Sequence, residues 1–400
     1  MNSNNRHFLS NAVDVKSRAF IQAFNQFIET GDFIALTRQF EQGFVQTGSN
    51  NHLSFAVKKA TAFLLDSGIL LIEPVEPELA SSKKESTKVD YAKKSYKNII
   101  ISSGIHGNET APIEIVQQLI SDIIAHKTQV KHRTLFIIGN PVAMNRAKRF
   151  QTENLNRLFS GKYQEVSPCF EKFRAEKLEA YVGKFFNADT ANDASLAAFP
   201  ATPPTSSAKK VTNYHYDLHT AIRHSKYEKF AIYPYQADKQ WNKEQLSFMA
   251  ICGVNTVLFG HGPSGTFSYF SSSHFSAHSF TIELGKTRPF GENNIADFTA
   301  IINNLCKLIS DKKIALKPFN NNHFNLFKAL GDITKVSENF RLFIDDDVSN
   351  FTDFPIDSLL STDRGQEYRT TQRGESIIFP NADVGNGQRA ALMVVPTILS

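Results

Sequence analysis

The chain has 400 residues, 41% of them hydrophobic and 34 of them phenylalanine, which is enough for roughly two or three domains with a sizeable packed core. Its 44 basic and 39 acidic side chains leave a formal net charge of +5 with no helix-length basic run, which gives little support to nucleic acid or a membrane surface as the main partner. No apolar stretch approaches the roughly 18 residues that a membrane-spanning helix needs.

The N-terminal residues and the cysteines indicate the compartment. The first residues lack the charged start, apolar core and cleavage site of a secretory signal. Cys169, Cys252 and Cys306 are widely spaced and form no CxxC pair, so they predict free thiols rather than a disulfide framework or a cysteine-rich zinc site. The sequence therefore predicts a cytoplasmic protein.

The expected elements begin with an amphipathic helix over 16–30 and a strand-like run over 62–72. Strands and helices then alternate along the chain. The expected strands cover 98–103, 134–139, 214–218, 230–233 and 279–283, and the expected helices cover 111–124 and 295–309. Such alternation predicts a mainly parallel or mixed sheet covered by helices.

After about residue 317 the pattern changes to short β-type runs, such as 340–344 and 376–380, separated by turn residues. This pattern predicts a smaller, all-β C-terminal domain. Polar and Ala/Pro-rich segments near 80–96 and 188–210 are expected to be surface insertions. The expected division is an N-terminal helical segment over 1–50, an α/β domain that carries the chemistry over 51–316, and the β domain over 317–400.

Chemistry-bearing side chains follow three of the expected strands. His106 and Glu109 lie in the turn GIHGNE, His219 lies in the sequence DLHT, and Glu283 ends the strand in TIELGK. In open α/β sheets, ligand sites gather beyond the carboxyl ends of the strands. Two histidines and one carboxylate, with water at the fourth position, form a recurrent catalytic zinc arrangement. Glu283 could then accept a proton from a water activated by the metal.

These residues taken singly leave other interpretations open. His215 competes with His219, but on a strand the two stand about 13 Å apart at ~3.3 Å per residue, so they cannot share one zinc ion. Each histidine also fits a hydrogen-bonded core residue, and Glu283 fits a hydrated strand end. A His-x-x-Glu spacing such as that of His106 and Glu109 is common by chance.

Two further segments, NPVAMNRAKRF at 140–150 and NLNRLF at 154–159, lie between these motifs. In this order the segments resemble the succinylglutamate desuccinylase family, which shares a zinc-carboxypeptidase-like fold with the aspartoacylases. The resemblance covers most of 50–312 and extends to GESIIFPN at 374–381 and GQRA at 387–390. It implies an α/β fold class: a zinc-carboxypeptidase-like mixed sheet flanked by helices, with the smaller C-terminal all-β domain.

The resemblance also implies a metal centre. One Zn²⁺ per subunit would be held by His106, Glu109 and His219, with Glu283 as the general acid and base. Cobalt suits similar ligands, so zinc is the family's expectation rather than a result of the residues themselves.

Substrate contacts are implied in the same way. Arg149, Asn156 and Arg157 would lie in the substrate pocket, and Arg223 is a further candidate. A guanidinium group matches a carboxylate in a bidentate way. For the arginines the alternative is a surface ion pair of little energetic value.

The implied reaction is zinc-dependent hydrolysis of N-succinyl-L-glutamate to succinate and L-glutamate, the last step of the arginine succinyltransferase route of arginine catabolism. The nearest alternative is a related aspartoacylase-like deacylase or a carboxypeptidase. A non-catalytic metabolite-binding protein is a second alternative, against which the intact set of three ligands and a base stands. The expected partner is this small-molecule substrate, with no nucleic acid and no membrane.

Overall fold

The computed structural model describes residues 18–41, 53–75, 96–186, 211–237 and 240–400. Their strands form one large mixed sheet and one small one. The large sheet contains, in spatial order, β1 (Leu53–Val57), β2 (Ala60–Asp66), β3 (Ile69–Pro74), β5 (Arg133–Ile138), β4 (Tyr96–Ser103), β6 (Val211–Ala221), β9 (His278–Lys286), β7 (Lys229–Tyr233), β8 (Thr256–Phe259), β10 (Asn325–Thr334), β16 (Arg389–Pro396), β15 (Ser376–Ile378) and β12 (Thr352–Asp353). The small sheet contains β11 (Arg341–Leu342), β13 (Leu359–Asp363) and β14 (Gln366–Arg369).

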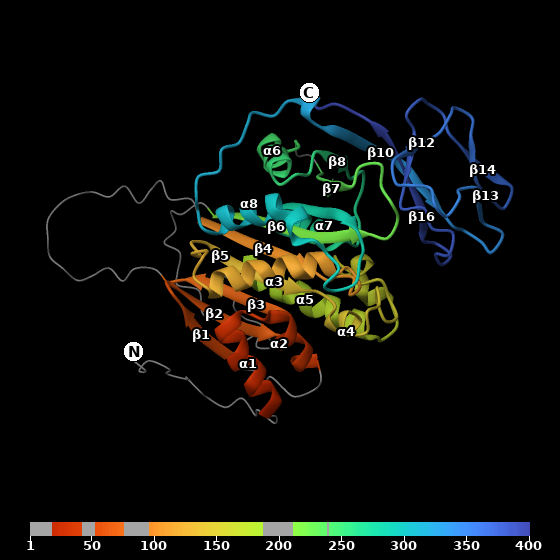
Figure 1. Ribbon diagram of the computed structural model, residues 1–400. Helices are drawn as coiled ribbons and strands as arrows, with labels where there is room; N and C mark the ends of the chain where they lie inside the picture. Colours follow the sequence, from red (N-terminus) through yellow and green to blue (C-terminus); the bar gives the residue numbers. More distant parts are fainter. Residues whose placement is uncertain (1–17, 42–52, 76–95, 187–210, 238–239) are drawn as a thin grey trace, which may run out of the picture.

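Helices lie on both faces of the large sheet (Figure 1). They are α1 (Arg18–Thr30), α2 (Phe33–Gln39), α3 (Thr110–Ile124), α4 (Pro141–Asn145), α5 (Phe170–Phe186), α6 (Lys243–Ile251), α7 (Phe267–Phe275) and α8 (Thr299–Ile309). Residues of α1, α2, α3, α6 and α8 pack in the core on one face, and residues of α5 and α7 pack in the core on the other. The expected fold class is thereby confirmed, with a mixed sheet flanked by helices.

Successive side chains along each strand point to opposite faces of the sheet. Ile99 and Ile101 of β4 belong to the first core, whereas Ile100 belongs to the second. In β6, Tyr216 and Leu218 face the first core, so the intervening polar residues point to the face that α5 and α7 cover. The polar residues of β6 thus share one side of the sheet.

The central strands bring their carboxyl ends to one edge. β5, β4, β6 and β9 pair in parallel in that order, whereas β7 joins β9 in the antiparallel direction. Because β4, β6 and β9 run the same way, the residues that follow or end each strand come close together. These are the strands that the sequence motifs follow.

The first strand prediction is wrong in one respect. The run over 62–72 is a β-hairpin, with β2 and β3 paired antiparallel, rather than one strand. Its turn contains Gly68, which adopts a positive φ of 66° that favours glycine. The expected helix over 16–30 is confirmed as α1, and the helix expected over 295–309 opens with a 3₁₀ turn (Ile295–Phe298) before α8.

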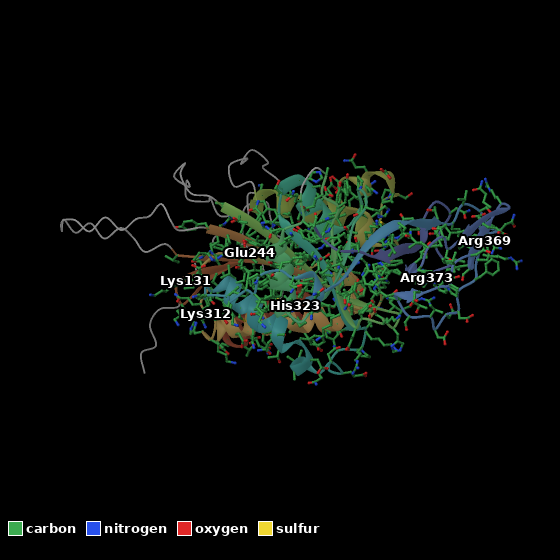
Figure 2. All side chains as sticks on the ribbon, turned by 90° about the horizontal axis from the view of Figure 1, so that it is seen from above. Lys131, Glu244, Lys312, His323, Arg369 and Arg373 are labelled. Atoms are coloured by element: carbon green, nitrogen blue, oxygen red, sulfur yellow. The ribbon has the colours of Figure 1, made fainter. Side chains whose placement is uncertain are left out.

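The two expected insertions, 80–96 and 188–210, lie outside the described residues, except that Tyr96 begins β4. At the other end of the sheet, β10 pairs in parallel with β8 and antiparallel with β16, so hydrogen bonding continues into the C-terminal strands. Figure 2 shows these strands projecting at one end of the molecule, where Arg369 and Arg373 are labelled. Within the parts of the chain that the structure describes, no helix has the length and apolarity to cross a membrane.

Candidate active site

The turn between β4 and α3 places His106 and Glu109. Glu109 is the N-cap residue of α3, but its side chain makes no capping hydrogen bond and points toward the histidines instead. The turn packs so tightly on α4 that a Cβ at Gly107 would lie 2.1 Å from the backbone nitrogen of Met144. Glycine is therefore required at position 107 for this approach.

His219 and Glu283 lie opposite each other on neighbouring strands. They are register partners in the parallel pairing of β6 with β9. Both side chains point to the face of the sheet opposite Leu218 and Ile282, which are in the first core. The sheet therefore brings together two residues that are distant in the sequence.

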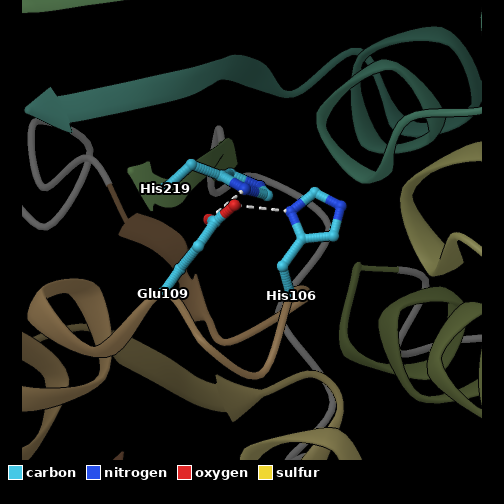
Figure 3. Close-up of side chains that lie close together, drawn as sticks. All are labelled: His106, Glu109 and His219. Carbon is cyan, nitrogen blue, oxygen red and sulfur yellow. Dashed lines mark hydrogen bonds and ion pairs between the residues drawn. The ribbon is translucent and has the colours of Figure 1, made fainter. Parts of the chain in front are cut away.

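His106, Glu109 and His219 form a compact cluster (Figure 3). One ligand atom from each residue lies within 4.8 Å of the others. Nδ1 of His106 is 2.8 Å from Oε1 of Glu109, and Nδ1 of His219 is 2.9 Å from Oε2. The three residues are only 3%, 1% and 1% exposed. Two imidazole nitrogens and a carboxylate oxygen that converge in a buried place fit a divalent metal ion.

The second ring nitrogen of each histidine faces an oxygen acceptor. Nε2 of His219 lies 2.8 Å from Oδ2 of Asp217, and Nε2 of His106 lies 2.9 Å from Oδ1 of Asn154. Such partners fix ring orientation and leave Nδ1 available for a metal. Sequence reasoning missed both partners. Asp217 carried a signal, because it precedes His219 by two residues on a strand, whereas Asn154 carried none.

The residues of the cluster change one another's pKa values. Burial alone would raise the pKa of Glu109, but the charges and hydrogen bonds of His106 and His219 hold it well below the usual range. Burial, followed by the charge of Arg149, lowers the pKa of His106 to about 4. Glu109 therefore remains an anion in the buried cluster, which favours a cation beside it.

Glu283 has a different environment from Glu109. Its side chain is buried, at 7% exposure, and its Oε2 has no hydrogen-bond partner among the residues that the structure describes. Burial, together with the negative charge of Glu109, raises the pKa of Glu283 to about 7. A carboxyl group with this pKa and a free oxygen can both accept and donate a proton near neutral pH.

Comparison with known proteins shows which family this chain belongs to. The succinylglutamate desuccinylase/aspartoacylase catalytic domain matches residues 95–197 and 205–309, and the AstE/AspA barrel-sandwich hybrid domain matches 322–397. The chain belongs to the succinylglutamate desuccinylase/aspartoacylase family. The second match confirms the expected β character of the C-terminal part.

Several members of the family resemble most of the chain. The succinylglutamate desuccinylase of Idiomarina loihiensis is 42% identical over 91% of this chain and 95% of its own length. That of Pseudoalteromonas atlantica is 45% identical over 76% of this chain and 83% of its own. The crystal structure of the Chromobacterium violaceum succinylglutamate desuccinylase covers 92% of this chain and 98% of its own, with 31% identity and a TM-score of 0.71.

In this family member, the structure brings Arg149 to the histidine cluster. Its Nη1 donates to Oε1 of Glu109 at 2.7 Å, and its carbonyl oxygen accepts from the backbone N–H of Gly107 at 3.0 Å. Asn156 is buried, and its Oδ1 accepts from the backbone N–H of Phe267 at 2.9 Å. The Arg157 side chain is exposed, and its Nη1 donates to the carbonyl oxygen of Asn156 at 2.8 Å.

Arg223 and His215 have partners of other kinds. Arg223 donates to the backbone carbonyls of Asp345 and Asp346 in the C-terminal part, and its Nη2 lies 3.3 Å from Oδ1 of Asp346. A role of Arg223 in substrate binding stays a prediction. His215 is fully buried between the hydroxyl groups of Ser102 and Ser271, at 2.8 and 2.7 Å, as a hydrogen-bonded core histidine.

Proposed function

We propose that this chain is a metal-dependent amidohydrolase that cleaves N-succinyl-L-glutamate to succinate and L-glutamate, the closing step of the arginine succinyltransferase route. The Glu283 carboxyl group supports this proposal most directly, because it is buried opposite His219 and its Oε2 has no hydrogen-bond partner within the described parts of the chain. The relatives named succinylglutamate desuccinylase, at 42% and 45% identity, support the choice of substrate.

The proposed metal is Zn²⁺, one per subunit, bound by His106, Glu109 and His219. Two imidazoles and one carboxylate are a usual protein ligand set for catalytic zinc. When bound, such an ion supplies Lewis-acid activation of the scissile carbonyl group and of water. Asp217 and Asn154 hold the two imidazole rings in the orientation that this binding needs.

Glu283 moves the protons of the reaction. Its carboxylate accepts a proton from the attacking water while the water oxygen bonds to the amide carbon. The carbon–nitrogen bond then breaks, and the Glu283 carboxyl group returns the proton to the departing nitrogen of glutamate. The second proton of the water passes from the new carboxyl group to the amine, so the products are the succinate carboxylate and the ammonium form of glutamate, and the atoms and charges balance.

The substrate supplies three carboxylates around one amide, which suits a site rich in arginine. Nη1 of Arg149 lies 2.7 Å from Oε1 of Glu109, so its positive charge is next to the proposed metal ligands. Asn154, the partner of His106, also accepts from the backbone N–H of Asn156 at 3.1 Å. Arg157 donates to the Asn156 carbonyl oxygen. We propose that Arg149, Asn156 and Arg157 orient the anionic substrate through charge-assisted hydrogen bonds.

The test is release of glutamate from N-succinyl-L-glutamate by the purified protein. Glutamate release that stops with a chelator and returns with zinc supports both the reaction and the metal. Release that returns with cobalt but not with zinc would assign cobalt as the metal instead. N-acetyl-L-aspartate and a hippuryl peptide, assayed in parallel, represent the aspartoacylase and carboxypeptidase alternatives. Zinc-loaded, folded protein that hydrolyses none of the three substrates would contradict the proposal.

We also propose that the enzyme is located in the cytoplasm. The three cysteines are free thiols, which suits a reducing compartment.

A further inference from the structure

The first turn of α5 contains a buried carboxylate that the proposed reaction does not use. Glu171 is the second residue of α5 and is 0% exposed. Its Oε1 accepts hydrogen bonds from the backbone N–H of Gln151 at 2.7 Å and from Nδ2 of Asn140 at 3.1 Å. Its Oε2 accepts from the backbone N–H groups of Thr152 and Glu153, at 3.3 and 3.5 Å. Hydrogen-bond donors therefore hold both oxygens of the carboxylate.

The successive backbone N–H groups of the loop over 151–153 all point to this one carboxylate. Backbone N–H groups that converge on one place form an anion-binding concavity. An ionised carboxylate has about four acceptor positions for such donors, and the N-terminus of a helix favours its negative charge. Glu171 therefore supplies the anion that fixes the course of this loop.

The residues that flank this loop contact the candidate metal ligands. On one side, Nη1 of Arg149 donates to Oε1 of Glu109 at 2.7 Å. On the other side, Oδ1 of Asn154 lies 2.9 Å from Nε2 of His106. The loop over 151–153 lies between these two residues in the chain, so its course decides where both side chains lie.

The helix that carries the carboxylate is itself tied to the sheet. Arg174, one turn further along α5, is buried and donates to the carbonyl oxygens of Ile138 and Gly139 at 3.0 and 2.7 Å. Residues of α5 also pack in the second core, against residues of β4 and β5. Glu171 therefore has a fixed position relative to the carboxyl end of β5, from which it can hold the loop.

We propose that Glu171 is a positioning residue for the metal site: through the loop over 151–153 it sets the positions of Asn154 and Arg149 beside the metal ligands. This inference rests on the proposed function, because the metal and the anionic substrate are the ligands that these two side chains serve. The hydrogen bonds of Glu171 go to the loop and to the N-cap of α4, so the loop transmits its effect to the metal site.

The first measurement is zinc affinity, by competition with a chromogenic chelator. Glu171→Gln keeps the size of the side chain but replaces one oxygen by an NH₂ group, which cannot accept from the N–H donors that it faces. Zinc affinity should fall about 10-fold, because the acceptor that orients the His106 ring is displaced. At saturating zinc, KM for N-succinyl-L-glutamate should rise more than kcat falls, because Arg149 is displaced as well. Glu171→Asp keeps the charge on a shorter side chain and should lose less affinity.

A double-mutant cycle separates positioning from general stability. Asn154→Ala removes the acceptor of His106 and should lower zinc affinity about 10- to 100-fold. Once that acceptor is absent, Glu171→Gln has nothing to displace at His106, so the double variant should bind zinc as weakly as Asn154→Ala alone. A purely structural carboxylate would lower the affinity by the same factor in both backgrounds. If denaturant unfolding shows that Glu171→Gln does not fold, the same cycle with Glu171→Asp decides.

The matched control is Glu179→Gln on the same helix. Oε1 of Glu179 accepts from the backbone N–H of Gly161 at 3.1 Å, so the change alters a similar hydrogen bond at another loop. Zinc affinity and KM should remain those of the parent enzyme. Parent-like zinc affinity in Glu171→Gln, or equal factors in both backgrounds of the cycle, would overturn the inference while the proposed function stands. A parent protein that binds no zinc and hydrolyses no N-succinyl-L-glutamate would instead overturn the proposed function, and the inference with it.

Discussion

The central strands and the C-terminal strands both bury glutamates, but they treat them differently. Glu375, in the C-terminal part, is fully buried and accepts hydrogen bonds from the Tyr368 hydroxyl group at 2.6 Å and the Thr371 backbone N–H at 2.8 Å. Glu283, in the second half of β9, is nearly as buried, but its Oε2 has no partner among the described residues.

When burial is the same, the hydrogen-bond partners separate a structural carboxylate from a reactive one. Among the described residues, Tyr368 and Thr371, which are nearby in the chain, donate to both carboxyl oxygens of Glu375. Glu283 instead faces Glu109 and His219 from other segments, and its pKa is raised by burial and by Glu109. Three substitutions and a pH profile test this contrast.

Replacing the reactive carboxylate should abolish most turnover. Glu283→Gln keeps the shape but cannot carry the proton, so kcat should fall by about 10²- to 10⁴-fold. Metal content, measured by elemental analysis, should remain that of the parent enzyme. Glu244→Gln, at an exposed site on α6, is the control and should keep full kcat. A near-normal kcat in Glu283→Gln would show that another group moves the proton.

Loss of the acceptor that orients the His219 ring should lower zinc affinity rather than slow the chemical step. Asp217→Asn weakens the acceptor that holds Nε2 of His219, so zinc affinity should fall about 10- to 100-fold. Competition with a chromogenic chelator measures this change, and excess zinc should restore most of kcat. Unchanged affinity would mean that the strand backbone alone orients the His219 ring.

The pH dependence should reveal the reactive carboxylate. Glu283 must be deprotonated to accept a proton, so kcat should decline as pH falls through its pKa, which is about 7 in the metal-free site. The positive charge of a bound metal favours the carboxylate, which moves this limb to lower pH. On the acidic side of the profile, kcat should fall about tenfold for each pH unit. The residual activity of Glu283→Gln should lack that limb.

The structural carboxylate should affect stability alone. Glu375→Gln replaces one of the two accepting oxygens by an NH₂ group, so the free energy of unfolding should fall by about 1–3 kcal/mol while kcat stays unchanged. Denaturant midpoints and steady-state rates measure the two quantities. Glu367→Gln, which is exposed, is the matched control. A loss of kcat at unchanged stability would give the C-terminal carboxylate a part in the reaction.

The sequence predicts this division only in part. His106, Glu109, His219 and Glu283 could be selected because each follows or ends an apolar strand, and parallel strands bring such positions to one edge. The pairing of His219 with Glu283 could not be derived, because register depends on contacts between strands rather than on either strand alone.

Other contacts carried weaker signals. Asn154 becomes an acceptor for His106 only because a loop 48 residues away folds against the turn. Asp332 lies near both Arg389 and His261 of the loop after β8, and no local pattern predicts these contacts. The β2–β3 hairpin was expected as one strand, because apolar residues on both sides of Gly68 conceal the turn.

The pairing of β8 with β10 has a consequence for the handling of this protein. β8 lies between β7 and β10, so both of its edges are hydrogen-bonded. A truncated chain that ends before β10 would uncover one edge of β8, whose four residues are all buried in the intact protein. Unpaired, apolar strand edges recruit other chains. Such a truncation should therefore aggregate rather than yield an isolated catalytic fragment.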